Sequence, residues 1–244
     1  MVRVLILGGT TEASDLARLL DVRPDTDVVT SFAGRTAAPR AVAGRTRVGG
    51  FGGATGLAEY LRAEAVDVVL DATHPFARQM RWHAADATDA TGIARLRVER
   101  PPWRADNSAD WTVVPDLDAA AQAVAGPGRV FLTIGRTELG AFARCDRTWF
   151  LVRSIEPPDP LPLRRAVVVL GRGPFTVERE RALMAEHTID TLVTKNSGGT
   201  AAAAKLTAAH ALGVAVVMVE RPPNPPGPLV ETADEALGWL TQSG

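Results

Sequence analysis

An internal repeat is the feature of this sequence that most restricts its fold. A Gly-x-Thr-Glu pattern begins at Gly9 and occurs again at Gly135, and the sequence Val-Glu-Arg-Pro-Pro occurs at residues 98–102 and 219–223. These matches keep the same order and a nearly constant separation along the chain. They predict two similar halves that meet near Gly126.

Each half also shows the pattern of an α/β protein. Short β-branched segments alternate with Ala-, Leu- and Glu-rich segments of helical period, which is typical of βα units and a mainly parallel sheet. In the first half the expected strands are residues 2–7, 28–32, 47–48, 66–70, 94–98 and 112–114. Further pairs across the repeat are Arg3 with Arg129, Asp67 with Asp190, and Val114 with Val230. We therefore expect an α/β fold of two Rossmann-like halves. They are a cofactor-binding half at residues 1–126 and a substrate-binding half at 127–244, with terminal elements open to exchange between the halves.

The loops that follow the strands are the expected ligand-binding segments. Loops after parallel strands emerge at one edge of the sheet, where ligands of open α/β sheets bind. In the first half these loops are residues 8–12, 49–53 and 71–77, and their counterparts are 135–138, 171–175 and 194–199. Two such edges facing each other predict a ligand cleft between the halves.

Charge and composition exclude several classes of partner. The formal net charge is −1, which gives no reason to expect nucleic acid or an acidic membrane as a partner. No apolar segment approaches the roughly 20 residues that span a bilayer. The single cysteine, Cys145, is consistent with a reducing cytoplasm. Of the 27 basic residues only Lys195 and Lys205 are lysines, so a lone arginine carries little information and Lys195 carries more.

Missing motifs exclude several enzyme classes. The only tyrosine, Tyr60, is followed four residues later by Glu64, so the Tyr-x-x-x-Lys pair of short-chain dehydrogenases is absent. The four histidines form no His-Glu-x-x-His motif or Cys–His cluster, so no metal site is expected. Neither a Gly-x-Ser-x-Gly motif nor a phosphate-binding P-loop occurs.

The first βα turn is a candidate dinucleotide site. A hydrophobic strand leads into Gly8 and Gly9, and an amphipathic helix follows. Glycines let the backbone approach a pyrophosphate, and amides at a helix start attract anions. The hydroxyls of Thr10 and Thr11 could add donors. The full Gly-x-Gly-x-x-Gly motif is absent, so an ordinary βα turn is the alternative.

The end of the second expected strand indicates NADP rather than NAD. An acidic residue at this point binds the ribose 2′-hydroxyl of NAD, whereas basic residues suit the 2′-phosphate of NADP. Here the segment contains Ser31, Gly34, Arg35 and Thr36 and no carboxylate. The alternative is an ordinary exposed Arg35 in an arginine-rich chain.

Two further loops of the first half complete the candidate cofactor site. Gly50, Phe51 and Gly52 lie in a loop rich enough in glycine to pass close to a planar ligand, with Phe51 either on the ligand or in the core. Thr73 and His74 follow a buried strand. His74 could orient a carboxamide or transfer a proton; the alternative is a structural histidine next to a helix-capping Thr73.

Lys195, Asn196 and Ser197 occupy the matching position of the second half. We expect the Lys195 ammonium to lie beside the amino end of the following helix, where both would attract one anion. Lys205, further along that helix, is expected to be a solvated surface charge.

Taken as an ordered set, the motifs resemble those of the precorrin-6A reductase family of cobalamin biosynthesis. The motifs are LGGTTEA, SFAGRT, GGFGG, DATHPFA, RPPW, GRGPF and TKNSGG. The resemblance implies hydride transfer from NADPH to one double bond of precorrin-6A, giving precorrin-6B. It also implies a large tetrapyrrole polycarboxylate as substrate, which cations near strand ends would bind. The candidate cations are Arg100, Arg136, Arg153, Arg172 and Lys195. His74 and Lys195 are candidate proton donors, and water or a substrate carboxyl would also serve. A non-catalytic NADP-sensing module and a reductase of another substrate are the alternatives.

Overall fold

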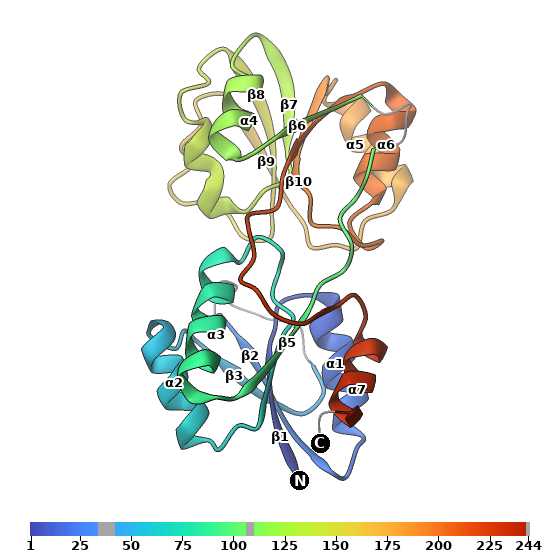
Figure 1. Ribbon diagram of the computed structural model, residues 1–244. Helices are drawn as coiled ribbons and strands as arrows, with labels where there is room; N and C mark the ends of the chain where they lie inside the picture. Colours follow the sequence, from blue (N-terminus) through green and yellow to red (C-terminus); the bar gives the residue numbers. More distant parts are fainter. Residues whose placement is uncertain (34–41, 106–109, 243–244) are drawn as a thin grey trace. The chain divides into compact units, whose positions relative to one another are not determined.

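The computed structural model describes residues 1–33, 42–105 and 110–242 (Figure 1). The chain forms two compact units, each with its own parallel sheet. Unit 1 contains Met1–Pro101 and Pro222–Gly244, and unit 2 contains Pro102–Arg221. No helix within the described ranges is long and apolar enough to cross a membrane.

Unit 1 is a six-stranded sheet in the order β12-β5-β4-β1-β2-β3. Its strands are β1 (Val2–Leu7), β2 (Thr26–Phe32), β3 (Arg45–Val48), β4 (Val68–Asp71), β5 (Ala94–Val98) and β12 (Leu229–Val230). Its helices are α1 (Thr11–Asp21), α2 (Gly53–Ala63), α3 (Arg78–Thr91) and α7 (Ala233–Gln242). Helices α1 and α7 pack side by side on one face (Figure 1), and α2 and α3 cover the other.

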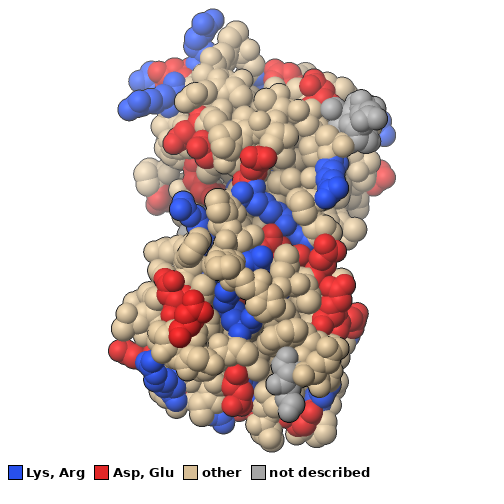
Figure 2. Space-filling view, viewed as in Figure 1, with Lys and Arg blue, Asp and Glu red and all other residues tan. Residues whose placement is uncertain are grey.

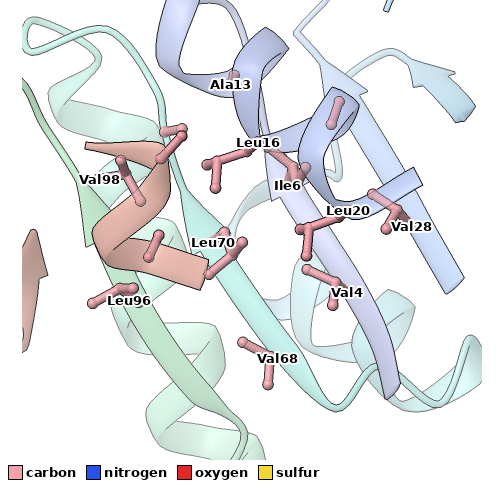
Figure 3. Close-up of a cluster of buried hydrophobic side chains, with 14 residues drawn as sticks. Val4, Ile6, Ala13, Leu16, Leu20, Val28, Val68, Leu70, Leu96 and Val98 are labelled. Atoms are coloured by element: carbon pink, nitrogen blue, oxygen red, sulfur yellow. The ribbon is translucent and has the colours of Figure 1, made fainter. Parts of the chain in front are cut away.

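The core of unit 1 follows from the alternation of side chains along its strands. Val4 and Ile6 of β1 point toward α1 and join a cluster with Leu16 and Leu20 (Figure 3). The neighbouring Leu5 and Leu7 point to the opposite face and pack with α2 and α3. Both faces of the sheet are buried, as expected for a parallel sheet with near-continuous apolar strands.

Unit 2 has the matching strand order, β6-β11-β10-β7-β8-β9. Its strands are β6 (Trp111–Val114), β7 (Gly128–Leu132), β8 (Thr148–Ser154), β9 (Ala166–Leu170), β10 (Thr191–Lys195) and β11 (Ala215–Val219). Its helices are α4 (Leu117–Ala123), the 3-10 helix η1 (Arg136–Phe142), α5 (Val177–Glu186) and α6 (Ala204–Leu212). The predicted α/β fold of two similar halves is confirmed.

The repeated residues make the same contacts in both units. The Arg3 amide donates to Asp67 Oδ2 at 2.8 Å, and the Arg129 amide donates to Asp190 Oδ2 at 2.7 Å. The two aspartate amides return hydrogen bonds to the carbonyls of the same arginines. These pairs recur in the sequence because they join two equivalent strands at the same register.

The terminal βα elements are exchanged between the units. β6 pairs with β11, Val114 opposite Val219, and β12 pairs with β5, Val230 opposite Val98. The division at residue 126 therefore differs from the folded units, because residues 102–126 belong to unit 2 and 222–244 to unit 1. Each boundary between the units falls within an Arg-Pro-Pro sequence. Proline ends a strand because it lacks an amide donor.

Candidate functional site

The two glycines between β1 and α1 are required for different reasons. A Cβ atom at Gly8 would lie 3.0 Å from Thr30 Cγ2, so a side chain there would be in tight contact with β2. Gly9 has φ +125°, a conformation that favours glycine, and a Cβ there would meet nothing within 4 Å. The backbone at Gly9 is therefore accessible to a ligand.

The threonines of this turn have different surroundings. Thr10 caps α1: its Oγ1 accepts from the Ala13 amide at 3.2 Å and donates to the Ala72 carbonyl at 2.8 Å. Its hydroxyl thus joins the glycine turn to the loop after β4, a role that the sequence did not predict. Thr11 is exposed at the first helical position. The cap occupies the Ala13 amide, whereas the Thr11 and Glu12 amides have no intrahelical acceptor and suit an anion.

Arg47 of β3 is a candidate cofactor residue that no motif in the sequence indicated. Its guanidinium donates to the Oγ of buried Ser31 at 3.2 Å and to the carbonyls of Gly49 and Gly50 at 2.7 and 2.8 Å. No carboxylate pairs with Arg47 among the residues that the structure describes. The predicted residues Gly34, Arg35 and Thr36 lie outside the described residues.

Phe51 belongs to the packing of unit 1. Its ring makes an edge contact with Tyr60 at 5.1 Å between centroids, and the Arg47 guanidinium lies 3.8 Å above it. The core alternative for Phe51 therefore fits the structure. The flanking Gly50 and Gly52 are exposed, and a Cβ at either would meet nothing within 4 Å.

Thr73 lies inside a buried polar network after β4. Asp71 Oδ1 accepts from the Thr73 amide at 3.2 Å and from its hydroxyl at 2.7 Å. Arg81 of α3 donates from Nε to Thr73 Oγ1 at 3.3 Å and from Nη2 to the Thr73 carbonyl at 3.1 Å. The helix-capping alternative for Thr73 is wrong. Helix α3 begins at Arg78, its N-cap residue is Ala77, and no side chain caps it.

The same network reaches the segment that returns to unit 1. Arg81, 1% exposed, also donates to Glu99 and to Asn224, which lies between the second crossing and β12. Arg97 Nε lies 3.6 Å from Glu99. Burial is the main influence on Arg97 and lowers its pKa, while the charge of Glu99 opposes this. The network therefore joins the loop after β4 to both β5 and the exchanged segment.

The structure sets the tautomer of His74. Its Nδ1 accepts from the Phe76 amide at 3.2 Å, so Nδ1 carries no proton and the proton of the neutral ring is on Nε2. The side chain is half-buried. An Nε2–H donor suits a carboxamide oxygen, and the orienting role of His74 stays a prediction.

In unit 2 Lys195 does not lie at a helix start. Helix α6 begins at Ala204, and the Lys195 Nζ donates instead to Glu138 Oε2 at 2.7 Å. The same oxygen accepts from the Gly135 amide at 3.0 Å. The predicted placement of the ammonium was wrong because the Ser-Gly-Gly segment leads into several turn residues before the helix.

Asn196 holds the start of unit 2. Its amide donates to the Trp103 carbonyl at 3.0 Å, and its Oδ1 accepts from the Trp103 amide at 2.8 Å. The Trp103 indole donates to the Gly199 carbonyl at 2.8 Å. The neighbouring Ser197 is buried. The RPPW and TKNSGG motifs are therefore joined by hydrogen bonds from Trp103 to Asn196 and Gly199.

The prediction for Lys205 was also wrong. Its side chain is buried, its Nζ donates to the Ala202 carbonyl at 3.1 Å, and it lies 5.0 Å from the centre of the Trp103 ring. A cation–π contact and the apolar stem stabilise this position.

Three of the four predicted substrate-binding arginines have carboxylate partners within their own unit. Arg100 pairs with Glu12 at 2.6 Å, Arg136 pairs with Glu156 at 2.8 Å, and Arg153 pairs with Glu180. Arg172, in the loop after β9, is exposed. In these three ion pairs the two residues are far apart in sequence, so no local sequence pattern predicts them.

Positive and negative side chains are interspersed on the visible face of each unit (Figure 2). The described residues contain no group of three His, Cys, Asp or Glu side chains able to hold a metal ion.

The parallel sheets and the open glycine turn define a class, the Rossmann-like α/β proteins. The accessible backbone at Gly9, Gly50 and Gly52 fits a dinucleotide.

The comparisons with known proteins identify the family. The model of the family described as Precorrin-6x reductase CbiJ/CobK matches residues 3–241. Precorrin-6A reductase of Rhodococcus erythropolis is 49% identical over 245 residues, which cover 100% of this chain and 98% of the relative. A solved structure described as CobK precorrin-6A reductase matches with a TM-score of 0.95 at 47% identity, covering 100% of this chain and 98% of that chain. Cobalt-precorrin-6A reductase of Methanothermobacter thermautotrophicus is 29% identical, covering 90% of this chain and 76% of the relative. The chain belongs to the precorrin-6x reductase family and is an oxidoreductase.

Proposed function

We propose that this chain uses NADPH to reduce one carbon–carbon double bond of precorrin-6A, giving precorrin-6B. The full-length similarity to relatives of that name is the observation that carries the proposal. One ring carbon receives a hydride, the adjacent carbon receives a proton, and NADPH leaves as NADP⁺.

In this proposal unit 1 binds the cofactor. The first-turn amides after Gly9 and the hydroxyl of Thr11 hold the pyrophosphate. Arg47 and Ser31, with Arg35, hold the 2′-phosphate, because a guanidinium binds phosphate with two donors at once. NADPH supplies the hydride when bound. His74 donates its Nε2 proton to a carboxamide oxygen or to the reduced ring.

Unit 2 supplies cations for the ring carboxylates. Arg172 is exposed and Arg136 is 39% exposed at its side chain, so both suit a large polycarboxylate. Arg153 is a weaker candidate because it already binds Glu180 and stacks on Phe175 at 3.9 Å.

The proposed ring is metal-free. The relatives that are 46–49% identical are named precorrin-6A reductase, whereas those at 28–29% are named for the cobalt form. We expect metal-free precorrin-6A to be reduced with the higher kcat/KM when both rings are assayed in parallel.

The test is anaerobic incubation with precorrin-6A and NADPH, followed through the NADPH absorbance band and the mass of the ring. We expect equal amounts of NADPH consumed and of ring product that has gained a hydride and a proton. NADPH binding without turnover of either ring would support an NADP-sensing module instead.

Lys195→Ala tests the second unit. Loss of the ammonium should raise KM for precorrin-6A and leave NADPH affinity nearly unchanged, because the pyrophosphate is assigned to unit 1. Since Lys195 also neutralises Glu138, the double variant Lys195→Ala with Glu138→Gln separates the two roles. Recovery of the wild-type KM in the double variant would show that Lys195 acts only on Glu138.

A further inference from the structure

The two equivalent glycine turns differ in the position of one carboxylate. Glu12 and Glu138 each follow the turn glycine, Gly9 or Gly135, by three residues. In unit 2 Glu138 Oε2 lies 3.0 Å from the Gly135 amide and accepts its hydrogen bond. In unit 1 Glu12 Oε2 accepts instead from Arg100 Nη1 at 2.6 Å.

The Gly135 amide already has an anionic acceptor from its own chain. No acceptor meets the Gly9 amide within the described part of unit 1. A carboxylate on a turn amide makes the bond that a phosphate oxygen would make, so it competes with a phosphate and also repels it.

Arg100 is well placed to prevent this competition. It follows β5 and directly precedes Pro101, whose ring restricts the backbone next to it. The side chains of Arg100 and Glu12 are only 16% and 19% exposed, so the pair is less screened by water than a surface ion pair.

We propose that Arg100 is a positioning residue that holds the Glu12 carboxylate away from the Gly9 amide and neutralises it, so that a pyrophosphate binds there. This inference rests on the proposed NADPH site of unit 1. It assigns Arg100 to cofactor binding through Glu12, in place of the predicted contact with substrate. In unit 2 the Glu138 carboxylate binds Lys195 and also stays on the Gly135 amide, so this turn is closed by its own Glu138.

The experiment measures NADPH affinity by titration calorimetry, without any ring substrate. The variants are Arg100→Met, Glu12→Gln and the double variant, with Arg18→Met as control. Arg18 lies on α1, the helix that carries Glu12, and pairs with Asp15 on the surface. Circular dichroism and thermal unfolding verify that each variant is folded.

Arg100→Met should weaken NADPH binding by about tenfold, the size of one charged interaction. Glu12→Gln should stay within about twofold of the wild type, because it removes the competing charge. The double variant should recover to within about threefold of the wild type. Added salt should reduce the defect of Arg100→Met, because salt screens the Glu12 charge. One NADPH should bind per chain.

Different failures have different meanings. A double variant as weak as Arg100→Met would overturn the inference, because Arg100 would then act directly on the cofactor or on the fold. Unchanged NADPH affinity in Arg100→Met with a raised KM for precorrin-6A would overturn it and restore the substrate role. A wild-type protein that does not bind NADPH would overturn the proposed function, and this inference with it.

Discussion

The neighbours of Arg47 indicate which part of a cofactor this side chain could bind. It lies beside Ser31 at the end of β2 and holds the glycine loop, and it has no carboxylate partner among the described residues. A cation in this position next to a serine hydroxyl suits a 2′-phosphate.

Arg47→Met should therefore weaken NADPH binding by about tenfold and change NADH binding by less than about twofold. Arg45→Met is the matched control, because Arg45 lies on the same strand, is exposed and pairs with Asp27. Equal losses for both cofactors would show that Arg47 supports the loop and does not read the phosphate. Arg35→Ala, outside the described residues, is expected to behave like Arg47→Met.

Arg81 shows what a fully buried charge contributes. Arg81→Met would leave Glu99 buried without its main partner and would remove both donors to Thr73. Breaking a buried pair in this way costs about 3–5 kcal/mol of unfolding free energy. Urea unfolding measures the loss, and Arg78→Met, exposed on the same helix, should change it by less than about 0.5 kcal/mol. A loss below about 1 kcal/mol in Arg81→Met would mean that the pair is not buried in solution.

At the scale of elements, the reactivity of Cys145 reports whether the exchanged helix α4 is packed on unit 2. The buried thiol donates to the carbonyl of Ala121 in α4 at 3.5 Å. Burial raises the pKa of the Cys145 thiol above its ordinary value of 9.0, and nearby Asp146 raises it further. Since the thiolate is the reactive form, the folded protein has less of it than an unfolded chain at the same pH.

Cys145 should thus react with a thiol reagent at pH 8 far more slowly in the native protein than in urea. The rate of the native protein should rise only at a pH above the pKa of a free cysteine. Because the unfolded thiol ionises first, this group stabilises the fold below pH 9.0 relative to higher pH, and that stability is lost as the pH rises through the raised pKa. The readout is unambiguous because the chain has one cysteine. Native labelling as fast as in urea would show that α4 is not held on unit 2.

At the scale of the whole molecule, the exchange makes the units unequal in sequence. Unit 2 is one continuous segment, Pro102–Arg221, whereas unit 1 needs residues from both ends of the chain. Without α7 the core of unit 1 loses Ala233 and Ala236 and exposes Leu96 and Val98.

The fragment 102–221 is expected to fold by itself and to unfold cooperatively in urea. Residues 1–101 alone should remain largely unfolded, because β5 and α1 lack their partners β12 and α7. Joining 101 to 222 directly should restore a folded unit 1. Circular dichroism and urea titration distinguish these outcomes, and a folded 1–101 fragment would contradict the expectation.

The spliced unit 1 also tests the division of labour. It should bind NADPH with an affinity within about tenfold of the full chain if the cofactor contacts lie mainly in unit 1. No binding by a folded unit 1 would move part of the cofactor site to unit 2.

Local patterns in the sequence determined the α/β class, the repeat and the loops of the candidate site. Strand and helix periods, and glycines that need unusual backbone angles, act over a few residues, so they can be read directly. This is why the glycine turn at Gly8 and Gly9 was predicted. The contacts of Asp67 and Asp190 were not predicted, but they join residues that the repeat had already paired.

Only the tertiary structure decided the exchange of the final βα elements and the partners of the charged side chains. Glu12 meets Arg100, Arg81 meets Glu99 and Asn224, and Lys205 lies under Trp103. These contacts join residues that are distant in sequence, and they exist because of the order in which strands pair. An arginine or lysine has the same local pattern whether it faces solvent, a carboxylate or a ligand. Its role therefore depends on which element the fold brings next to it.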